Sequence, residues 1–517
     1  MRVKNSMINI GAGLANQMII TILSFVSRTV FISTLGIEYL GINGLFTNIL
    51  AMLTLAEAGL GASIMYSLYK PLAESDHYRV NILMKFYKNA YLVIAAIVLV
   101  SGLAIMPFLD MFIKDTNINN VHSIYLIFLL NTVAPYFYVH KSSFLNVSQK
   151  GYIVTGIYSI SSILSVCLKI AILHFTQDYI LYLVIDSVIT ISNSIILAII
   201  VNKMYPFLRD KVKGKIDSST KKDITKNVKA LILQNIGNYL IFGTDNIIIS
   251  SFVSVAAVGI YSNYNMLIEI CRTFINQIFN NIYHSVGNLV AKENIEKVYS
   301  IYKTYRLLNF WLYSIFTIFL AIMLEPFISL WLGKDFLFEG NLIYVLMLIF
   351  FERGMRNSIT TLKTTSGIFH EDRYAPLCQA VINLVVSITL VQKIGITGVF
   401  IGTLVSALAV PFWLTPYLVY KKVFSKPISS YIRSYTVYLV TGFVVYLITK
   451  NTGDLINAHD IKTLILKAVI SLTIPNIIYI LIYHKTEEFK YLYGIAKGLF
   501  QKTFKLISLK KQIKNVG

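Results

Sequence analysis

The stretch TDNIIISSFVSVAAVGIYSNYNML, residues 244–267, repeats the pattern of SRTVFISTLGIEYLGINGLFTNIL, residues 27–50. In this alignment Gly41 matches Gly259 after one inserted residue. A second, weaker match follows in the same order: SQKGY at 148–152 and HEDRY at 370–374. Two matches at nearly the same offset indicate an internal repeat, in which both halves of the chain run through the same series of segments.

The composition is that of a polytopic membrane protein. Of the 517 residues, 56% are hydrophobic and only 14% are charged, whereas soluble domains carry about 25% charged residues. Apolar runs long enough to cross about 30 Å of hydrocarbon recur along almost the whole chain. We predict an all-α fold with fourteen transmembrane helices, near residues 7–30, 39–68, 86–109, 121–140, 152–173, 180–201, 230–250, 256–282, 307–330, 341–362, 375–392, 396–420, 433–449 and 464–483.

The net charge of +21 is explained by membrane topology and not by nucleic-acid binding. If the N-terminus lies in the cytoplasm, 37 of the 46 Lys and Arg residues fall in inner segments and six fall in outer segments. The inner group includes Arg306, Arg353 and Arg356. Because basic residues accumulate on the cytoplasmic side, this asymmetry predicts that both termini are cytoplasmic. The basic surface is expected to meet membrane lipid, and no nucleic-acid partner is predicted.

A polar, basic stretch between the sixth and seventh predicted spans divides the chain into halves. Both halves begin in the cytoplasm and hold six spans, so the repeat is parallel, about an axis along the membrane normal. The predicted domains are an N-terminal six-helix lobe at 1–201, a basic cytoplasmic linker at 202–229, a C-terminal six-helix lobe at 230–420, helices 13 and 14 at 421–484, and a basic cytoplasmic tail at 485–517.

Four segments carry a family resemblance: LGIEYLGINGLF following Arg28, AEAGLGASI, TDNIIIS with AVGIYSNYNML, and KIGITGVFIGTLVS at 393–406. They resemble the polysaccharide repeat-unit flippases (Wzx type) of the MATE-like MOP exporter superfamily. The resemblance covers roughly residues 5–480. It implies two six-helix lobes that form a V around a central cavity, with two extra C-terminal helices.

The resemblance also implies a transporter and not an enzyme, working by alternating access in the bacterial plasma membrane. The implied cargo is an undecaprenyl-pyrophosphate-linked oligosaccharide, moved from the inner to the outer leaflet for surface polysaccharides such as capsule. A polysaccharide polymerase and glycosyltransferases are expected partners. No metal or organic cofactor is expected, because the sequence holds no Walker loop, zinc motif or dinucleotide fingerprint. A coupling H⁺ or Na⁺ is left open.

Three cations lie within predicted spans: Arg28, Lys169 and Arg272. A lipid-linked sugar carries an anionic pyrophosphate, and a guanidinium can donate two hydrogen bonds to a phosphate. We therefore expect these residues to bind the substrate. Two of them have a structural alternative. Glu269 lies on the same helical face as Arg272, and Lys169 is close enough to a helix end for its amine to reach the surface.

Intramembrane carboxylates are candidates for charge pairing or ion coupling, and four are predicted: Glu57, Asp186, Asp245 and Glu269. The repeat places Asp245 over Arg28, so these two charges are expected to offset each other across a hydrated cavity. Glu57 precedes two glycines that would bend the second span. The sequence does not decide which of the four carboxylates binds a coupling ion.

Three other functions stay open on the sequence. A flippase for teichoic-acid or peptidoglycan precursors would handle the same head-group chemistry. A MATE-type drug or cation antiporter would need a mainly acidic or apolar cavity, which three intramembrane cations disfavour. A membrane polymerase would need an outer platform for its chemistry, and the predicted outer connections are short.

Overall fold

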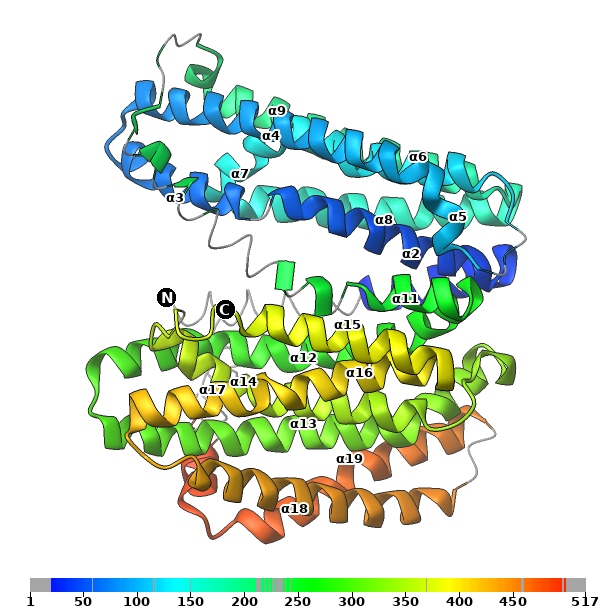
Figure 1. Ribbon diagram of the computed structural model, residues 1–517, viewed down its shortest axis with the longest axis vertical. Coiled ribbons are helices and arrows are strands. Elements are labelled where there is room, and N and C mark those ends of the chain that lie inside the picture. The colour runs from blue at the N-terminus through cyan, green and yellow to red at the C-terminus, as the bar shows by residue number, and fades with distance from the viewer. Residues whose placement is uncertain are drawn as a thin grey trace, which may run out of the picture. The chain divides into compact units, whose positions relative to one another are not determined.

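The computed structural model describes residues 20–57, 59–114, 116, 118–148, 150–210, 214, 216–218, 220–222, 224–225, 228, 236–237, 239–241, 243–368, 370–456, 460–494 and 497–498. Every regular element within these ranges is helical (Figure 1). The predicted all-α membrane fold is therefore confirmed. The predicted first span, linker and basic tail lie partly outside the described residues, as does the span predicted at 230–250.

The chain forms two compact units. The first comprises the residues up to Ser262 together with Ile388–Val399. Its central helix is α4, which packs on α3, α6 and α7. The helices are Ile20–Leu35, α2 (Ile37–Leu53), η1 (Thr54–Glu57), α3 (Leu60–Ala73), α4 (His77–Ile105), η2 (Met106–Phe108), α5 (Leu109–Phe112), α6 (Val121–Val133), η3 (Ala134–Phe137), α7 (Val139–Val147), α8 (Gly151–Thr176), α9 (Tyr179–Met204), η4 (Pro206–Arg209) and α11 (Asp245–Phe252).

The second unit comprises Asn263–Ser387 and the residues from Phe400 onward. Its core helix is α13, which contacts α14, α18 and α19; α18 and α19 lie side by side (Figure 1). The helices are α12 (Val255–Lys292, begun in the first unit), α13 (Ile295–Trp331), η5 (Lys334–Phe336), α14 (Leu342–Thr365), α15 (Ala375–Ile394), α16 (Ile396–Ala409), α17 (Pro411–Val419), the π-helical turn η6 (Tyr420–Phe424), α18 (Ser429–Asp454) and α19 (Ile461–Tyr483).

This division is based on compactness and falls inside α12. The division predicted from the repeat falls in the linker at 202–229. The two criteria differ, because compactness groups helices by packing and the repeat groups them by order along the chain. The predicted lobe boundaries therefore stay a prediction.

Eight described helices are long and apolar enough to cross a membrane, and two bent helix pairs would raise this number to ten. One pair, Ile20–Leu35 with α2, bends by 118° and so forms a hairpin between the first two predicted spans. Two further helices, α12 and α14, are long enough to cross but are more polar. The described residues therefore do not establish the predicted count of fourteen, because several predicted spans are broken or carry charges.

Helix starts follow from the local sequence. The side chains of Asp76, Asp178 and Asn294 accept hydrogen bonds from backbone amides at the beginnings of α4, α9 and α13. At α19, Asp460 and Thr463 form a reciprocal capping box. Each of these residues satisfies amides that have no partner within the helix. They fix where the long apolar helices begin.

The two repeat-matched glycines meet in the first unit. A Cβ atom added at Gly41 would lie 2.0 Å from the carbonyl oxygen of Val255, and one at Gly259 would lie 2.3 Å from that of Ile37. Val255 follows Ile37 by the same offset that separates Gly259 from Gly41. The contact is therefore reciprocal between matched positions, and only glycine allows either backbone approach.

Candidate functional site

A first cluster of predicted site residues gathers around Tyr182 in the first unit. Lys169 on α8 forms an ion pair with Asp186 on α9, and its Nζ atom lies 4.8 Å from the Tyr182 ring centroid. Ser165 donates a hydrogen bond to the Asp186 carboxylate at 3.2 Å. The spacing explains the arrangement: Ser165 and Lys169 are four residues apart on α8, as are Tyr182 and Asp186 on α9, so each pair shares a helical face.

Arg28 reaches the same tyrosine from the helix Ile20–Leu35. Its guanidinium interacts electrostatically with Tyr182 and donates a hydrogen bond from Nη1 to Ser262 Oγ at 3.0 Å. The Ser262 hydroxyl in turn donates to the carbonyl oxygen of Gly259 at 2.7 Å. Tyr182 is thus flanked by two cations, and Arg28 is tied to the reciprocal glycine contact.

Asp245 does not form the expected ion pair with Arg28 in the part of the chain that the structure describes. It lies in the first turn of α11, is 9% exposed, and one of its carboxylate oxygens is buried without a hydrogen-bond partner. Arg28 donates to Ser262 instead. A match in the repeat does not require contact: Arg28 lies within the helix Ile20–Leu35, whereas Asp245 is the first residue of α11. The N-terminal end of α11 offsets part of the carboxylate charge.

Glu57 lies at a break in the second predicted span. The 3₁₀ turn η1 and Gly59, which has a φ of 80°, separate α2 from α3. The Tyr91 hydroxyl donates a hydrogen bond to Glu57 Oε1 at 2.5 Å. The bend expected from the glycines is therefore present, and it places a carboxylate where the helix backbone is interrupted.

A second cluster lies around Tyr313 in the second unit. Arg272 and Glu269 form an ion pair on α12, as the sequence alternative proposed. Arg353 on α14 interacts electrostatically with both of them, and Tyr313 on α13 with all three. A Cβ atom at Gly354 would lie 2.1 Å from the Tyr313 ring. The missing side chain therefore lets α14 bring Arg353 close to the tyrosine.

Arg353 was not predicted as a site residue, because it was assigned to the inner side of the membrane. In the structure Arg353 lies near the middle of α14. One turn along, Arg356 forms an ion pair with Glu352, with 2.5 Å between Nε and Oε1, and Glu352 is only 4% exposed. The signal was present, because these charges fall inside the span predicted at 341–362. Tyr182 and Tyr313 gave no signal among the chain's 34 tyrosines.

Arg306 was also missed, and it is a structural cation. It is 6% exposed on α13. Its guanidinium carbon lies 5.4 Å from the Tyr302 ring centroid and 5.6 Å from that of Tyr438, and it donates to the Tyr420 hydroxyl at 3.4 Å. Aromatic faces and phenol oxygens stabilise a desolvated cation. Because the rings enclose it, Arg306 is not accessible to a ligand.

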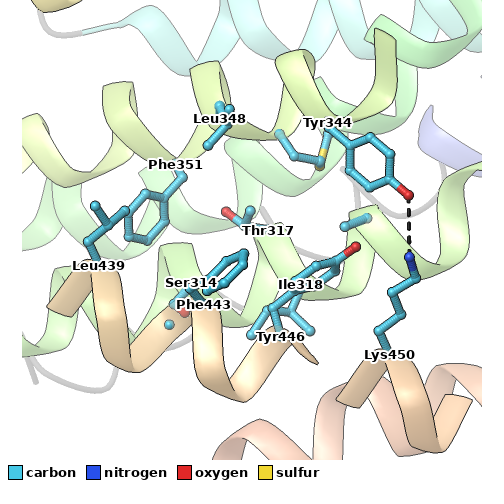
Figure 2. Close-up of a pocket in the computed structure, with 13 residues that line it drawn as sticks. Ser314, Thr317, Ile318, Tyr344, Leu348, Phe351, Leu439, Phe443, Tyr446 and Lys450 are labelled. Carbon is cyan, nitrogen blue, oxygen red and sulfur yellow. Dashed lines mark hydrogen bonds between the residues drawn. The ribbon is translucent and has the colours of Figure 1, made fainter. Parts of the chain in front are cut away.

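A pocket of about 440 Å³ opens between α13, α14 and α18 in the second unit. Its lining is mostly apolar, with Phe351, Leu439 and Phe443 among the wall residues (Figure 2). At one end Lys450 donates to the Tyr344 hydroxyl at 3.4 Å. The pocket is suited to an apolar chain with a polar group at the Lys450 end.

Comparisons with known proteins agree with this architecture. The lipid II flippase MurJ in an inward closed conformation is 14% identical, over 91% of this chain and 98% of that chain, with a TM-score of 0.60. An inward-facing multidrug resistance MATE family transporter of the MOP superfamily is 14% identical, over 77% and 94%, with a TM-score of 0.58. The Vibrio cholerae MATE transporter VcmN is 14% identical, over 80% and 95%, with a TM-score of 0.53.

At this level of identity the shared property is the fold, and these neighbours are transporters and a flippase, not enzymes. No curated protein matches the chain. The model of the family described as polysaccharide biosynthesis protein matches residues 6–283, more than half of the sequence. The chain therefore belongs to the polysaccharide biosynthesis protein family and has the fold of the MOP superfamily.

Proposed function

We propose that the chain is a flippase that carries an undecaprenyl-pyrophosphate-linked oligosaccharide from the inner to the outer leaflet of the bacterial plasma membrane by alternating access. The family and the fold support this proposal. The observation that carries it is the Tyr182 cluster, where Arg28 and Lys169 supply two cationic groups against one carboxylate. An excess positive charge inside a helix bundle favours an anionic head group and disfavours an organic cation.

Asp186 holds Lys169 in place while no phosphate is bound. A charge-assisted hydrogen bond to a phosphate oxygen resembles one to a carboxylate in strength. An incoming pyrophosphate therefore replaces Asp186 as the partner of Lys169 without leaving that half-buried cation unpaired, which would be unfavourable. The Tyr182 ring face contacts the ammonium group before and after the exchange.

Arg28 couples the head-group site to the glycine contact. Its partner Ser262 donates to the Gly259 carbonyl, and Gly259 packs on the backbone of Ile37. When Arg28 turns to a phosphate, Ser262 loses the hydrogen bond that it accepts from Arg28. The start of α12 thereby loses this link to the helix Ile20–Leu35. Head-group binding thereby weakens the contact between the helix Ile20–Leu35 and the start of α12. Alternating access requires changes of this type.

Two partly exposed rings beside the cluster, Tyr182 and Tyr39, supply a surface for sugars, and the rings that they pack against, Phe31 and Tyr179, are buried. Phe31 lies 5.3 Å from Tyr182, and Tyr39 lies 4.8 Å from Tyr179, measured between ring centroids. The apolar pocket of the second unit is suited to the lipid tail, because its volume falls in the range of about 300–1,000 Å³ that is usual for ligand pockets. Head group, glycan and tail thus each have a matching chemistry in the chain.

A flippase for a peptidoglycan or teichoic-acid precursor is the second candidate. The observation that favours it is the similarity in fold to the lipid II flippase MurJ. Such cargoes share the phosphate and the lipid tail, so the same clusters would serve. A polysaccharide polymerase and glycosyltransferases are the proposed partners if the cargo is a polymer repeat unit.

Deletion of the gene tests the proposal. Lipid-linked repeat units should accumulate in the inner leaflet, and surface polymer should disappear while cell-wall synthesis continues. Arrest of cell-wall synthesis with lipid II accumulation would select the second candidate. Normal polymer together with sensitivity to cationic drugs would reject both and favour an antiporter.

Cysteine labelling tests the proposed orientation, with both termini in the cytoplasm. In intact cells a membrane-impermeant thiol reagent should label Asn119→Cys and spare Ser218→Cys. Lysis should make Ser218→Cys reactive, which controls for buried cysteine. Labelling of Ser218→Cys before lysis would overturn the orientation.

A further inference from the structure

The proposed transport cycle needs an energy source, and the coupling ion is not fixed by the cationic clusters. Among the candidate carboxylates, Glu57 is contacted by the hydroxyl groups of two tyrosines, Tyr91 and Tyr136. It sits where η1 and Gly59 interrupt the helix, so nearby backbone and side chains can rearrange without breaking a continuous helix. Carboxylates at breaks in transmembrane helices line ion and proton pathways in transporters.

Tyrosine hydroxyls on α4 connect Glu57 to α7. Tyr91 donates to Glu57 Oε1 at 2.5 Å, and Tyr87 donates to Ser143 Oγ at 2.9 Å. The two rings lie 4.9 Å apart, and their hydroxyls interact with each other. The hydroxyls meet over Gly61, where an added Cβ would lie 2.6 Å from Tyr91 and 3.0 Å from Tyr87. Gly61 thus leaves space for an unbroken row of hydroxyl groups.

The row is sheltered from the surroundings. Tyr87 and Tyr91 are each 1% exposed, and Tyr136 on η3, which also interacts with Glu57, is 7% exposed. One turn before Ser143 on α7 lies His140, 5% exposed, with Nδ1 buried and without a hydrogen-bond partner. The charged groups at this far end of the row are Lys88 and Lys141, which interact with His140.

We propose that Glu57 binds the coupling proton of the transport cycle and that Tyr91, Tyr87 and Ser143 pass this proton between Glu57 and the α7 end of the first unit. The role in transport rests on the proposed flippase function. The binding of the proton does not.

The proton balance follows from the hydroxyl chemistry, since each hydroxyl has one proton to donate and can accept as well. With Glu57 ionised, the row points toward the carboxylate: Ser143 donates to Tyr87, Tyr87 to Tyr91, and Tyr91 to Glu57. In the structure Tyr91 already has this direction, whereas Tyr87 donates to Ser143, so this state requires the Tyr87 hydroxyl to turn toward Tyr91. With Glu57 protonated, every bond reverses, and the carboxyl group donates to Tyr91. In passing from one state to the other, each hydroxyl takes one proton and gives one. Water at the α7 end exchanges the last proton.

A proton fits this site better than Na⁺. The phenol groups of Tyr91 and Tyr136 turn toward the carboxylate, and Tyr91 presents its O–H hydrogen to Oε1. This positive end of the O–H dipole repels a metal cation from that oxygen. A lone carboxylate with hydroxyl donors is the simpler acceptor of H⁺.

Proton binding can be measured without cargo. Infrared difference spectra between low and high pH, recorded on the full chain in proteoliposomes, report the carboxyl C=O stretch. The wild type should show a titrating carboxyl band that Glu57→Gln lacks and the exposed-site control Glu74→Gln retains. A Glu57→Gln spectrum identical to that of the wild type would overturn the proposal.

Export at matched protein level tests the relay. Tyr91→Phe should lower surface polymer about tenfold, the effect of losing one hydrogen bond to a charged group. Tyr125→Phe is the matched control, because it removes a buried hydroxyl that donates to the Gly102 carbonyl at 3.1 Å, outside the row. Gly61→Ala should resemble Tyr91→Phe, whereas Gly156→Ala, with open space around its Cβ position, should export normally.

Equal export from Tyr91→Phe and Tyr125→Phe would remove the relay. Normal surface polymer after gene deletion would instead reject the flippase function. In that case, loss of the band in Glu57→Gln would still assign the proton to Glu57, for a different cargo.

Discussion

The two cationic clusters, one in each unit, use the same ingredients in different places. Around Tyr182 there are Arg28, Lys169 and Asp186; the Tyr313 cluster has Arg272, Arg353 and Glu269. Each therefore holds two cations, one carboxylate and one tyrosine, with one positive charge in excess. The Tyr182 cluster draws on α8 and α9, whereas the Tyr313 cluster draws on α12, α13 and α14.

The difference lies in how the carboxylate is held. Asp186 pairs with Lys169 across two helices, so this ion pair also links α8 to α9. Glu269 pairs with Arg272 three residues away on one helix, so this ion pair links no second helix, and Arg353 of α14 interacts electrostatically with both of its members. We infer that the Tyr182 cluster carries a structural role in addition to ligand binding.

The largest effect is expected for Arg28→Ala. Loss of a two-pronged phosphate donor should reduce export on the order of a hundredfold, since each charge-assisted bond contributes about 1.5–3 kcal/mol. Arg28→Lys should keep part of the activity, because it retains the charge but not the fork. Surface polymer at matched protein level is the measurement. Wild-type export from Arg28→Ala would exclude Arg28 as a phosphate ligand and leave it only the structural hydrogen bond to Ser262.

Arg353→Ala should lower export about tenfold, as one donor of the second cluster is lost. The melting temperature of the purified variant, measured alongside export, separates a binding role of Arg353 from a packing role. The exposed Arg433→Ala serves as the control and should change neither property. A lower melting temperature with unchanged export would make Arg353 a packing residue and end the parallel between the clusters.

Neutralising the two carboxylates tests the cross-helix link. Asp186→Asn should lower the melting temperature of the purified protein by a few degrees, because a half-buried Lys169 loses its partner. Glu269→Gln should change it less, since pairs three residues apart on one helix contribute about 0.2–0.5 kcal/mol. Both variants should bind inorganic pyrophosphate more tightly than the wild type. Equal melting temperatures for the two variants would remove the distinction drawn here.

The smallest effect is expected at a surface ion pair outside both clusters. The hydrogen bond from Lys422 holds the pKa of the Glu371 carboxyl below its usual value. A depressed folded-state pKa contributes stability above the unfolded pKa, and this contribution is lost as the pH falls through the folded value. Because the pair is exposed, Lys422→Ala should raise the pKa of Glu371 without a measurable change in melting temperature. A large change would show that the loop has a tertiary role.

The sequence predicted the fold class from the composition, and the repeat from glycines whose contact in the structure is reciprocal. It also selected the intramembrane ions, because a charge in an apolar run is a strong signal. It predicted one partner, Glu269 for Arg272, from their spacing on a single helix, but it could not predict partners on other helices. Arg28 was matched to Asp245 by repeat position, but contact depends on the direction of a long side chain. Tyr182 and Tyr313 could not be singled out, since a tyrosine in a membrane helix usually needs no explanation.

Arg306 was lost for a different reason. It lies one residue before the span predicted at 307–330 and was counted as an inner-loop residue, in keeping with the positive-inside rule. Arg353 was counted in the same way, although it lies inside the span predicted at 341–362. In the structure α13 runs for 37 residues, longer than a bilayer requires at 1.5 Å per residue. Helices that extend beyond the membrane blur the boundary on which the rule depends.

The reciprocal glycine contact determines how α2 and the start of α12 pack against each other and how they could move apart. At its two closest points a carbonyl oxygen faces a glycine Cα, with no side chain between them. Weak contacts of the Cα–H···O type contribute only about 0.5–1 kcal/mol each. The Cγ1 atoms of Val255 and Ile37 lie beside these points, so packing at the seam depends on those two side chains and on bare backbone. A bulkier residue at either glycine would meet the facing carbonyl oxygen and force the two backbones apart.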